Sequence, residues 1–211
     1  MDDAEEVQLY GEMNHAEVNQ SFVEDLLAGG PVGSRVIDLG CGTGLIPVLL
    51  CQQDPEVEVL AVDASINMLE AARTEIEMGG VQGRVFLEHA DCKELSVFEP
   101  KSCQTLISNS LLHHLPEPTT VLQDALALIK PGGRLFLRDL LRPVDEPSVE
   151  ALVEKHASSE PPVAQQLLRQ SLHAALSESE LETMVGELGI SKEAIRITSD
   201  RHWTIDATID G

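Results

Sequence analysis

The chain has 211 residues and a formal net charge of −22 at pH 7, with 36 acidic residues against 14 lysines and arginines. This charge would repel a phosphate backbone and no Lys/Arg run offsets it, so we expect no nucleic-acid partner. The length suits a single domain over 1–211, and the short apolar runs and acidic start predict a cytoplasmic protein without a membrane span or signal peptide.

The first predicted element is a helix over 15–28. Val18, Phe22 and Leu26 recur there at helical spacing, and Gly29 with Gly30 would end the helix. We expect residues 1–30 to form an N-terminal helical cap in front of the first strand.

The next element is an apolar strand over 35–39 that leads into glycines at every second position, Gly40, Gly42 and Gly44. Such a loop lets the backbone turn tightly and approach a ligand before a helix begins. Asp38 would face that ligand. Its carboxylate would repel a pyrophosphate but would hold a ligand that carries an ammonium and a sulfonium group. The loop therefore favours S-adenosylmethionine (SAM) over NAD.

Further along, apolar strands alternate with helical segments, a pattern that predicts right-handed parallel crossovers. After a break at 142–147, the pattern predicts two more helices, and the segment around Ser177 resembles a helix start. The chain is thus predicted to be a doubly wound α/β sheet. The expected strands lie near 57–62, 84–89, 104–109 and 134–139, and the expected helices near 43–53, 65–78, 118–130, 148–156, 162–176 and 181–188.

The segment Asp38-Leu-Gly-Cys-Gly-Thr-Gly44 resembles motif I of the class I SAM-dependent methyltransferases. Four more segments, between Val59 and Asp139, resemble later motifs of that family in the right order. The resemblance implies an α/β, Rossmann-like, seven-stranded sheet with helices on both faces, mostly parallel, with an antiparallel terminal hairpin formed by 195–197 and 203–209.

The resemblance also implies a cofactor site for SAM, with S-adenosylhomocysteine as the product. The ribose would bind a carboxylate at the end of the second strand, and the adenine would bind the acidic turn after the third. An N-terminal aromatic residue would fold over the cofactor. The residues that inherit cofactor binding are Tyr10, Asp38, Gly40, Cys41, Gly42, Asp63, Ala64, Met68, Asp91, Cys92 and Asn109.

The acceptor is expected beside the loop after the fourth strand, at Leu-His113-His114-Leu. His113 could remove a proton from the acceptor, or it could only shape or cap the loop. Asn109, which ends the strand, could position the reacting group. Asp139 and Arg142 could bind an amine or a carboxylate of the acceptor, or they could pair with each other. The remaining histidines lack ligand spacing, so we expect no metal.

The sequence therefore predicts a SAM-dependent methyltransferase that acts on a small molecule. Its loop and turn motifs look most like the branch related to quinone and sterol methyltransferases, and the helices within 145–177 are expected to form a lid. A SAM-binding regulatory protein without catalysis, or less favourably an NAD-dependent oxidoreductase, remains an alternative. The sequence leaves the acceptor, the methylated atom and the oligomeric state open.

Overall fold

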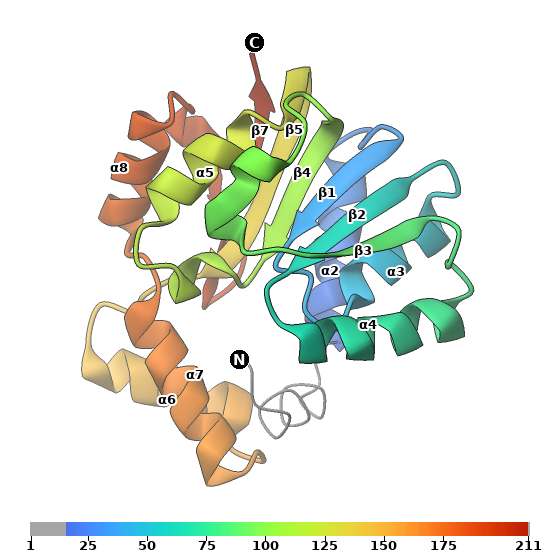
Figure 1. Ribbon diagram of the computed structural model, residues 1–211. Coiled ribbons are helices and arrows are strands. Elements are labelled where there is room, and N and C mark those ends of the chain that lie inside the picture. The colour runs from blue at the N-terminus through green and yellow to red at the C-terminus, as the bar shows by residue number, and fades with distance from the viewer. Residues whose placement is uncertain (1–15, 211) are drawn as a thin grey trace.

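The computed structural model describes residues 16–210, and its centre is one seven-stranded sheet (Figure 1). The strands are ordered β3-β2-β1-β4-β5-β7-β6. Their bounds are Arg35–Leu39 (β1), Glu58–Asp63 (β2), Val85–His89 (β3), Cys103–Asn109 (β4), Ile129–Leu140 (β5), Ile195–Ile197 (β6) and His202–Ile209 (β7).

The first five strands are parallel, and β7 runs antiparallel to both β5 and β6. This confirms the mostly parallel sheet with an antiparallel terminal hairpin. The chain moves outward from β1 to β3 and then returns to β4 on the other side of β1. A reversal of this kind leaves a crevice at the carboxyl ends of the two central strands, where ligands of open α/β sheets bind.

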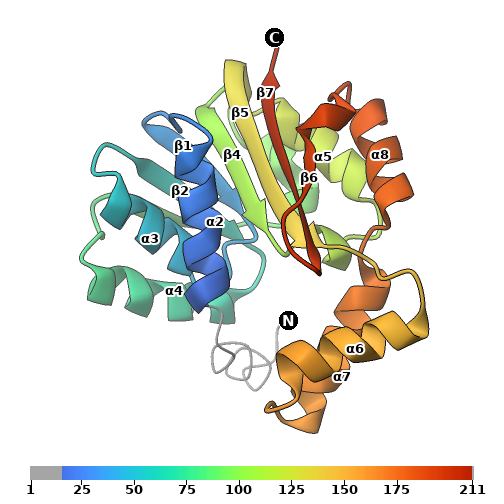
Figure 2. The ribbon, with the colours of Figure 1, turned by 180° about the vertical axis from the view of Figure 1, so that it is seen from behind.

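Helices cover both faces of the sheet, as expected. Helices α2, α3 and α4 lie on one face, and α5 and α8 lie on the other (Figures 1 and 2). Within residues 16–210, three short 3₁₀ helices, which the sequence pattern did not indicate, lie in the connections. The bounds are Ala16–Ala28 (α2), Leu45–Gln53 (α3), Ile66–Gly79 (α4), Pro118–Leu126 (α5), Glu178–Glu187 (α8), Cys92–Val97 (η1), Leu112–His114 (η2) and Lys192–Ala194 (η3).

The sheet is buried between two apolar layers. On the α2 side, Phe22 packs edge-to-face against Phe136 of β5, with ring centroids 5.0 Å apart. On the α8 side, Trp203 of β7 is fully buried with Leu181 and Val185. Each large side chain buried in this way stabilises the fold by roughly 1.5–3 kcal/mol. The two layers hold the carboxyl ends of the strands in fixed positions.

The boundary between α5 and β5 differs from the prediction. The helix ends at Leu126 rather than near residue 130, and β5 begins at Ile129 rather than at residue 134. The reason is pairing: the N–H of Cys103 donates to the carbonyl of Leu128 at 3.1 Å, and Cys103 pairs with Ile129. These apolar residues join the sheet, and periodicity alone cannot assign so short an apolar run to helix or strand.

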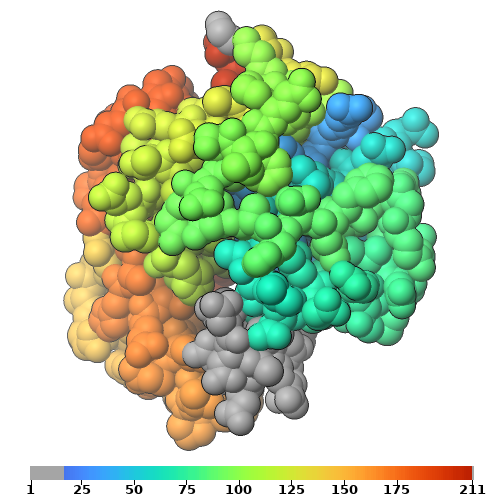
Figure 3. Space-filling model, in the orientation of Figure 1, coloured from blue at the N-terminus to red at the C-terminus, as the bar shows by residue number. Residues whose placement is uncertain are grey.

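Helices α6 (Glu146–Ala157) and α7 (Pro162–Ala174) pack against each other beyond the carboxyl ends of the parallel strands (Figures 1 and 2). Their contact is a small apolar core that includes Val149, Val153 and Leu172, and Leu140 at the end of β5 belongs to the same core. In the space-filling view this pair forms the lower left part of the surface (Figure 3). We call these two helices the α6–α7 pair.

The chain leaves the sheet for the α6–α7 pair and returns to it at one place. Leu141 and Leu176 form an isolated parallel bridge, and the N–H of Arg142 donates to the carbonyl of Leu176 at 2.9 Å. The pair is therefore attached to the sheet through two adjacent backbone segments.

Part of the N-terminal prediction lies outside the described residues, including Tyr10. From Ala16 on, α2 contacts α3 on one face of the sheet. Among residues 16–210, no helix combines the length and the apolar character that crossing a membrane requires.

Candidate functional site

The glycine loop closes the carboxyl end of β1. Gly40, Gly42 and Gly44 all have left-handed backbone conformations, with φ of 70°, 54° and 76°. The N–H groups of Gly40 and Cys41 both donate to the carbonyl of Val62, at 2.9 and 3.0 Å, which fixes the loop to β2. A side chain on Gly40 would come within 2.9 Å of Leu111, whereas Gly42 has nothing within 4 Å of the position that a Cβ would take. Gly42 therefore leaves open space.

A cavity lies under this loop. Its lining includes Asp38, Gly40, Cys41, Gly42 and Asn109, so the structure brings together five of the residues predicted to bind the cofactor. They come from β1, the glycine loop and the end of β4, at the reversal point of the sheet.

Asp38 carries a carboxyl group that is buried at the end of β1. Its side chain is buried, and burial, assisted by the nearby charge of Asp63, raises the pKa of Asp38 to about 8. A carboxyl group of this kind is protonated at neutral pH unless a positive charge comes close to it. The site is thus suited to a cationic ligand.

Asn109 provides a second polar group in the cavity. Its side-chain oxygen is buried, and among the described residues it has no hydrogen-bond partner. Buried amide oxygens are normally satisfied, and one without a partner in a cavity can accept a hydrogen bond from a ligand. The next residue, Ser110, has a φ of 58°, a left-handed backbone conformation that is unfavourable for residues other than glycine. The backbone is thus strained where the strand meets the cavity.

Asp63 joins the glycine loop to the start of α4. One carboxylate oxygen accepts from the N–H of Gly42 and the other from the N–H of Ser65, each at 2.8 Å. The hydroxyl of Ser65 in turn accepts from the N–H of Met68 at 3.3 Å and caps the helix. Ala64 is exposed beside Asp63, whereas Met68 is buried. Each carboxylate oxygen can accept a further bond, as a ribose diol would require.

Asp91 and Cys92 follow the end of β3. The Asp91 carboxylate accepts from the N–H of Lys93 at 2.9 Å and lies 3.2 Å from the Lys93 ammonium. Cys92 is buried, and burial together with the charge of Asp91 raises the pKa of its thiol to about 11. The thiol is therefore protonated at neutral pH, and this cysteine is not a nucleophile.

His113 and Asp139 form a buried pair at the end of β5. The ring Nδ1 of His113 lies 2.6 Å from the carboxylate of Asp139, and the two side chains are 5% and 1% exposed. The ring of the adjacent His114 has its centroid 4.1 Å from that of His113. Helix α7 contacts the 3₁₀ turn η2 that carries both histidines.

Arg142 does not pair with Asp139, which the sequence had left as one option. Its guanidinium binds the carboxylate of Glu180 at the start of α8, and Glu180 also accepts from the N–H of Ser177 at 2.8 Å. Arg142 therefore lies at the attachment of the α6–α7 pair, separate from the contact between His113 and Asp139.

Four residues of the cavity lining were not predicted from the sequence, and one of them, Asn19, comes from outside the glycine loop and α3. Asn19 of α2 lines the same cavity as Asp38 and is 9% exposed. Its signal was the presence of a polar residue beside the apolar positions Val18 and Phe22 of a helix. Such a residue is often satisfied by its surroundings, so the pattern alone did not distinguish it.

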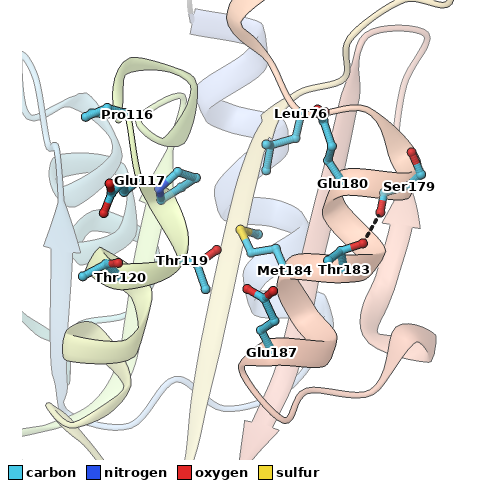
Figure 4. A pocket seen from close by; sticks show the side chains of 11 residues that line it. Pro116, Glu117, Thr119, Thr120, Leu176, Ser179, Glu180, Thr183, Met184 and Glu187 are labelled. Carbon is cyan, nitrogen blue, oxygen red and sulfur yellow. Dashed lines mark hydrogen bonds between the residues drawn. The ribbon is translucent and has the colours of Figure 1, made fainter.

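A second, wider groove of about 520 Å³ lies between the start of α5 and α8 (Figure 4). Its walls carry Thr119 and Glu117 on one side, and Met184 and Glu187 on the other. The hydroxyl of Thr183 donates to the carbonyl of Ser179 within α8, so this polar group is already satisfied inside its own helix. None of the residues that the sequence assigned to ligand binding lines this groove.

No cluster of three or more histidine, cysteine, aspartate or glutamate side chains suited to a metal ion occurs within residues 16–210. The cysteines Cys41, Cys51, Cys92 and Cys103 are all free thiols.

Comparison with known proteins gives a consistent result. Residues 36–133 match the family model of a methyltransferase domain. The chain is 34% identical over 110 residues to a ubiquinone biosynthesis O-methyltransferase of Xanthomonas euvesicatoria, a match that covers 52% of this chain and 44% of that protein. It is 32% identical over 123 residues to the 27-O-demethylrifamycin SV methyltransferase of Amycolatopsis mediterranei, covering 58% and 44%.

The fold also has solved counterparts. A SAM-dependent methyltransferase from Aquifex aeolicus superposes with a TM-score of 0.68 at 16% identity, covering 98% of both chains. At that identity the likeness concerns the fold. The matches span less than half the length of the two curated relatives.

Proposed function

Because the chain belongs to the class I SAM-dependent methyltransferases, we propose that it transfers the methyl group of SAM to a small-molecule acceptor. The observation that carries the proposal is the cavity under the glycine loop. It combines a buried carboxyl group, an amide oxygen without a partner among the described residues, and a glycine that faces open space.

These groups fit the charged end of SAM. Asp38 would ionise beside the ammonium or sulfonium, and Asn109 would accept a hydrogen bond from the ammonium. Gly42 would let the backbone approach the ligand. When bound, SAM supplies an activated methyl group, and the task of the protein is to align the acceptor with it in a site that excludes water.

The rest of the cofactor would extend along the strand ends. We assign the ribose hydroxyls to Asp63 and the adenine to the turn at Asp91 and Cys92, with Ala64 and Met68 at the edge of the site. In support, Asp63 is fixed by two backbone N–H groups while its oxygens keep acceptor capacity. Tyr10 keeps its assignment from the sequence.

The acceptor class follows from two lines of support. The net charge of −22 disfavours nucleic acid, and the relatives named above act, by their names, on small molecules of quinone and rifamycin type. The acceptor would lie between η2 and the α6–α7 pair, and we propose that this pair is the lid over it. A cytoplasmic location remains part of the proposal.

The second candidate is a SAM-binding protein that does not catalyse transfer. It shares the cofactor cavity and would bind SAM without turnover on any acceptor. An NAD-dependent oxidoreductase is less well supported, because the pyrophosphate would meet the buried Asp38.

Isothermal titration with SAM, S-adenosylhomocysteine and NAD tests the proposal. We expect micromolar binding of both adenosyl ligands, and no binding of NAD. Asp38→Ala and Asp63→Ala should each abolish this binding, whereas Asp124→Asn, an exposed carboxylate on α5, should leave it unchanged. Binding of NAD, or of none of the three ligands, would exclude the methyltransferase.

A further inference from the structure

The guanidinium of Arg201 has no partner among the described residues. Arg201 directly precedes β7 and is half-buried. Its backbone N–H donates to the hydroxyl of Ser199 at 3.2 Å, but its side chain forms no hydrogen bond or ion pair within residues 16–210. Burial lowers the pKa of the guanidinium and the charge of Asp200 raises it, and arginine remains charged in proteins. A partly buried positive charge therefore stands here without a counterion, which is energetically unfavourable.

A shortage of carboxylates does not explain this. The chain has 36 acidic residues against 14 lysines and arginines. Asp200, the neighbour of Arg201, instead contacts α6, since it lies 2.7 Å from the Lys155 ammonium and 3.0 Å from the His156 ring. In the described part of the chain, the other lysines and arginines without an ion pair are at the amino ends of the parallel strands or exposed on β6, namely Arg35, Arg84, Lys101, Lys130 and Arg196. Arg201 differs from them because it lies at the carboxyl ends.

Arg201 lies where the α6–α7 pair is attached to the sheet. Because β7 runs antiparallel to β5, its first residue, His202, is opposite Leu140 at the carboxyl end of β5. The carbonyl of Arg201 accepts from the N–H of Leu141 at 2.9 Å, and Leu141 forms the bridge to Leu176. The turn before β7 faces the α6–α7 pair (Figure 2). Arg201 is therefore at the end of the sheet where the acceptor is proposed to lie, on the side of the proposed lid.

The start of β7 carries a second donor without an acceptor. The side chain of Trp203 is fully buried, and its indole Nε1 has no hydrogen-bond partner among residues 16–210. Buried donors are normally satisfied, and one without a partner costs about 1–3 kcal/mol. Arg201 and Trp203 thus give this corner of the sheet more donors than acceptors. An anion that binds Arg201 would bring acceptor oxygens to it.

From these observations, and resting on the proposed function, we infer that Arg201 binds a carboxylate of the methyl acceptor. The substrate class is a small molecule that carries a carboxylate in addition to the atom that receives the methyl group. The planar guanidinium matches the two oxygens of a carboxylate, and such bidentate pairs are among the strong polar contacts of proteins. A phosphate monoester has about two negative charges, and the net charge of −22 repels it more than a carboxylate with one.

An unpaired guanidinium can be removed without loss of stability. Arg201→Gln should therefore unfold at the wild-type temperature or slightly above it, because no internal ion pair is broken and an unfavourable charge is removed. Thermal unfolding without ligand measures this, with Arg196→Gln, an exposed arginine on β6, as the matched control. A clear loss of stability in Arg201→Gln alone would show that the guanidinium is paired within the protein and would overturn the inference.

Benzoate is the probe for the ligand, on the whole chain saturated with S-adenosylhomocysteine. We expect roughly millimolar binding of benzoate, no measurable binding of benzamide, and a shift of the Arg201 Nε–H resonance in an NMR titration. The resonance is assigned through Arg201→Gln. That variant should bind benzoate at least about tenfold more weakly, because a charge-assisted hydrogen bond is lost. Arg201→Lys should lose less, and Arg196→Gln should bind as the wild-type protein does.

Phenyl phosphate distinguishes a carboxylate from other anions. Weaker binding of phenyl phosphate than of benzoate supports the inference, whereas tighter binding would overturn it and assign the site to phosphate. Benzoate that does not bind the wild-type protein, or that binds Arg201→Gln equally well, would also overturn it. The affinity for S-adenosylhomocysteine is measured in the same samples. If that ligand binds as expected, the proposed function stands in each of these outcomes.

Discussion

At the scale of single residues, the backbone of the glycine loop and the polar contacts around it have different physical origins. Gly40, Gly42 and Gly44 stand at fixed spacing within one loop, so their left-handed conformations follow from local chemistry. The contact of His113 with Asp139 joins residues 26 positions apart. It depends on the β4–β5 pairing and on the 3₁₀ turn η2, and neither leaves a periodic signal in the sequence.

Asp38 gives the first prediction at this scale. Because its pKa is about 8 without ligand, binding of the cationic cofactor at pH 7 should ionise it and release about one proton. Titration calorimetry in buffers of different ionisation enthalpy measures that number directly. Asp38→Asn should release none and should bind SAM about tenfold to hundredfold more weakly, the value of one charge-assisted hydrogen bond.

The same group has a defined effect on stability. The folded-state pKa of Asp38 lies above its model value of 3.8, so between about pH 4 and pH 8 the folded state holds a proton that the unfolded state lacks. Its contribution to stability therefore decreases as the pH rises through that window. A heat of SAM binding that does not depend on the buffer would contradict the release of a proton from Asp38.

At the scale of elements, the strong signals were caps and buried strands. Ser177 and Glu180 form the capping box that begins α8, as their spacing indicated. The end of α5 and the start of β5 were harder to place. Leu128 and Ile129 are apolar residues that suit a helix or a strand, and only their pairing with Cys103 assigns them to the sheet. The packing of α6 on α7 was also not visible, because it depends on how two amphipathic faces meet.

The α6–α7 pair leads to the second prediction. Besides its backbone attachment, α6 is held to the β6–β7 turn by Asp200, which lies 2.7 Å from the Lys155 ammonium and 3.0 Å from the His156 ring. Asp200→Asn should raise hydrogen exchange in α6 and α7 several-fold. It should lower global stability by at most about 1 kcal/mol, because partly exposed ion pairs contribute little.

Hydrogen exchange followed by mass spectrometry checks this prediction. Glu150→Gln is the matched control, because it removes the ion pair between Glu150 and Arg169 inside the α6–α7 pair, at 2.6 Å, and leaves the contact with Asp200 intact. Equal exchange in both variants would show that Asp200 does not hold the pair.

At the scale of the whole molecule, the fold class followed from the order of elements, whereas the titration behaviour required the structure. The alternation of strands and helices is a property of the sequence, and it predicted the doubly wound sheet. The burial of an individual ionisable group, in contrast, depends on the three-dimensional packing around it. Trp203 and His202, neighbours in β7, are both buried, and the sequence pattern does not indicate the burial of the histidine.

His202 gives the third prediction. Its burial and the nearby charges of Arg201 and Arg138 lower its pKa to about 4. Between about pH 6.5 and pH 4 the unfolded state binds a proton that the folded state does not, so this contribution to stability is lost as the pH falls. Each pH unit in that window removes about 1.4 kcal/mol. Over the same pH range the raised pKa of Asp38 has the opposite effect, because its contribution to stability increases as the pH falls.

Urea unfolding at pH 7 and pH 5 measures the effect. His202→Gln should reduce the loss of unfolding free energy between those pH values by about 2 kcal/mol. His173→Gln, which changes an exposed histidine on α7, should leave the pH dependence as in the wild-type protein. An unchanged pH dependence in His202→Gln would contradict the prediction.

The bridge between Leu141 and Leu176 has a consequence for how this scaffold can diversify. The two ends of the α6–α7 pair are neighbours in space, and the pair packs around a small apolar core to which Leu140 of β5 also contributes. The intervening chain is therefore one compact insertion. Loops with adjacent ends tolerate replacement because closing them requires little rearrangement of the host. If the pair is the lid proposed above, grafting the corresponding segment of another methyltransferase onto these two anchor points should change acceptor preference while cofactor binding persists. Exchange of this insertion between related genes would change the part of the protein that lies beyond the strand ends and leave the sheet and the glycine loop as they are.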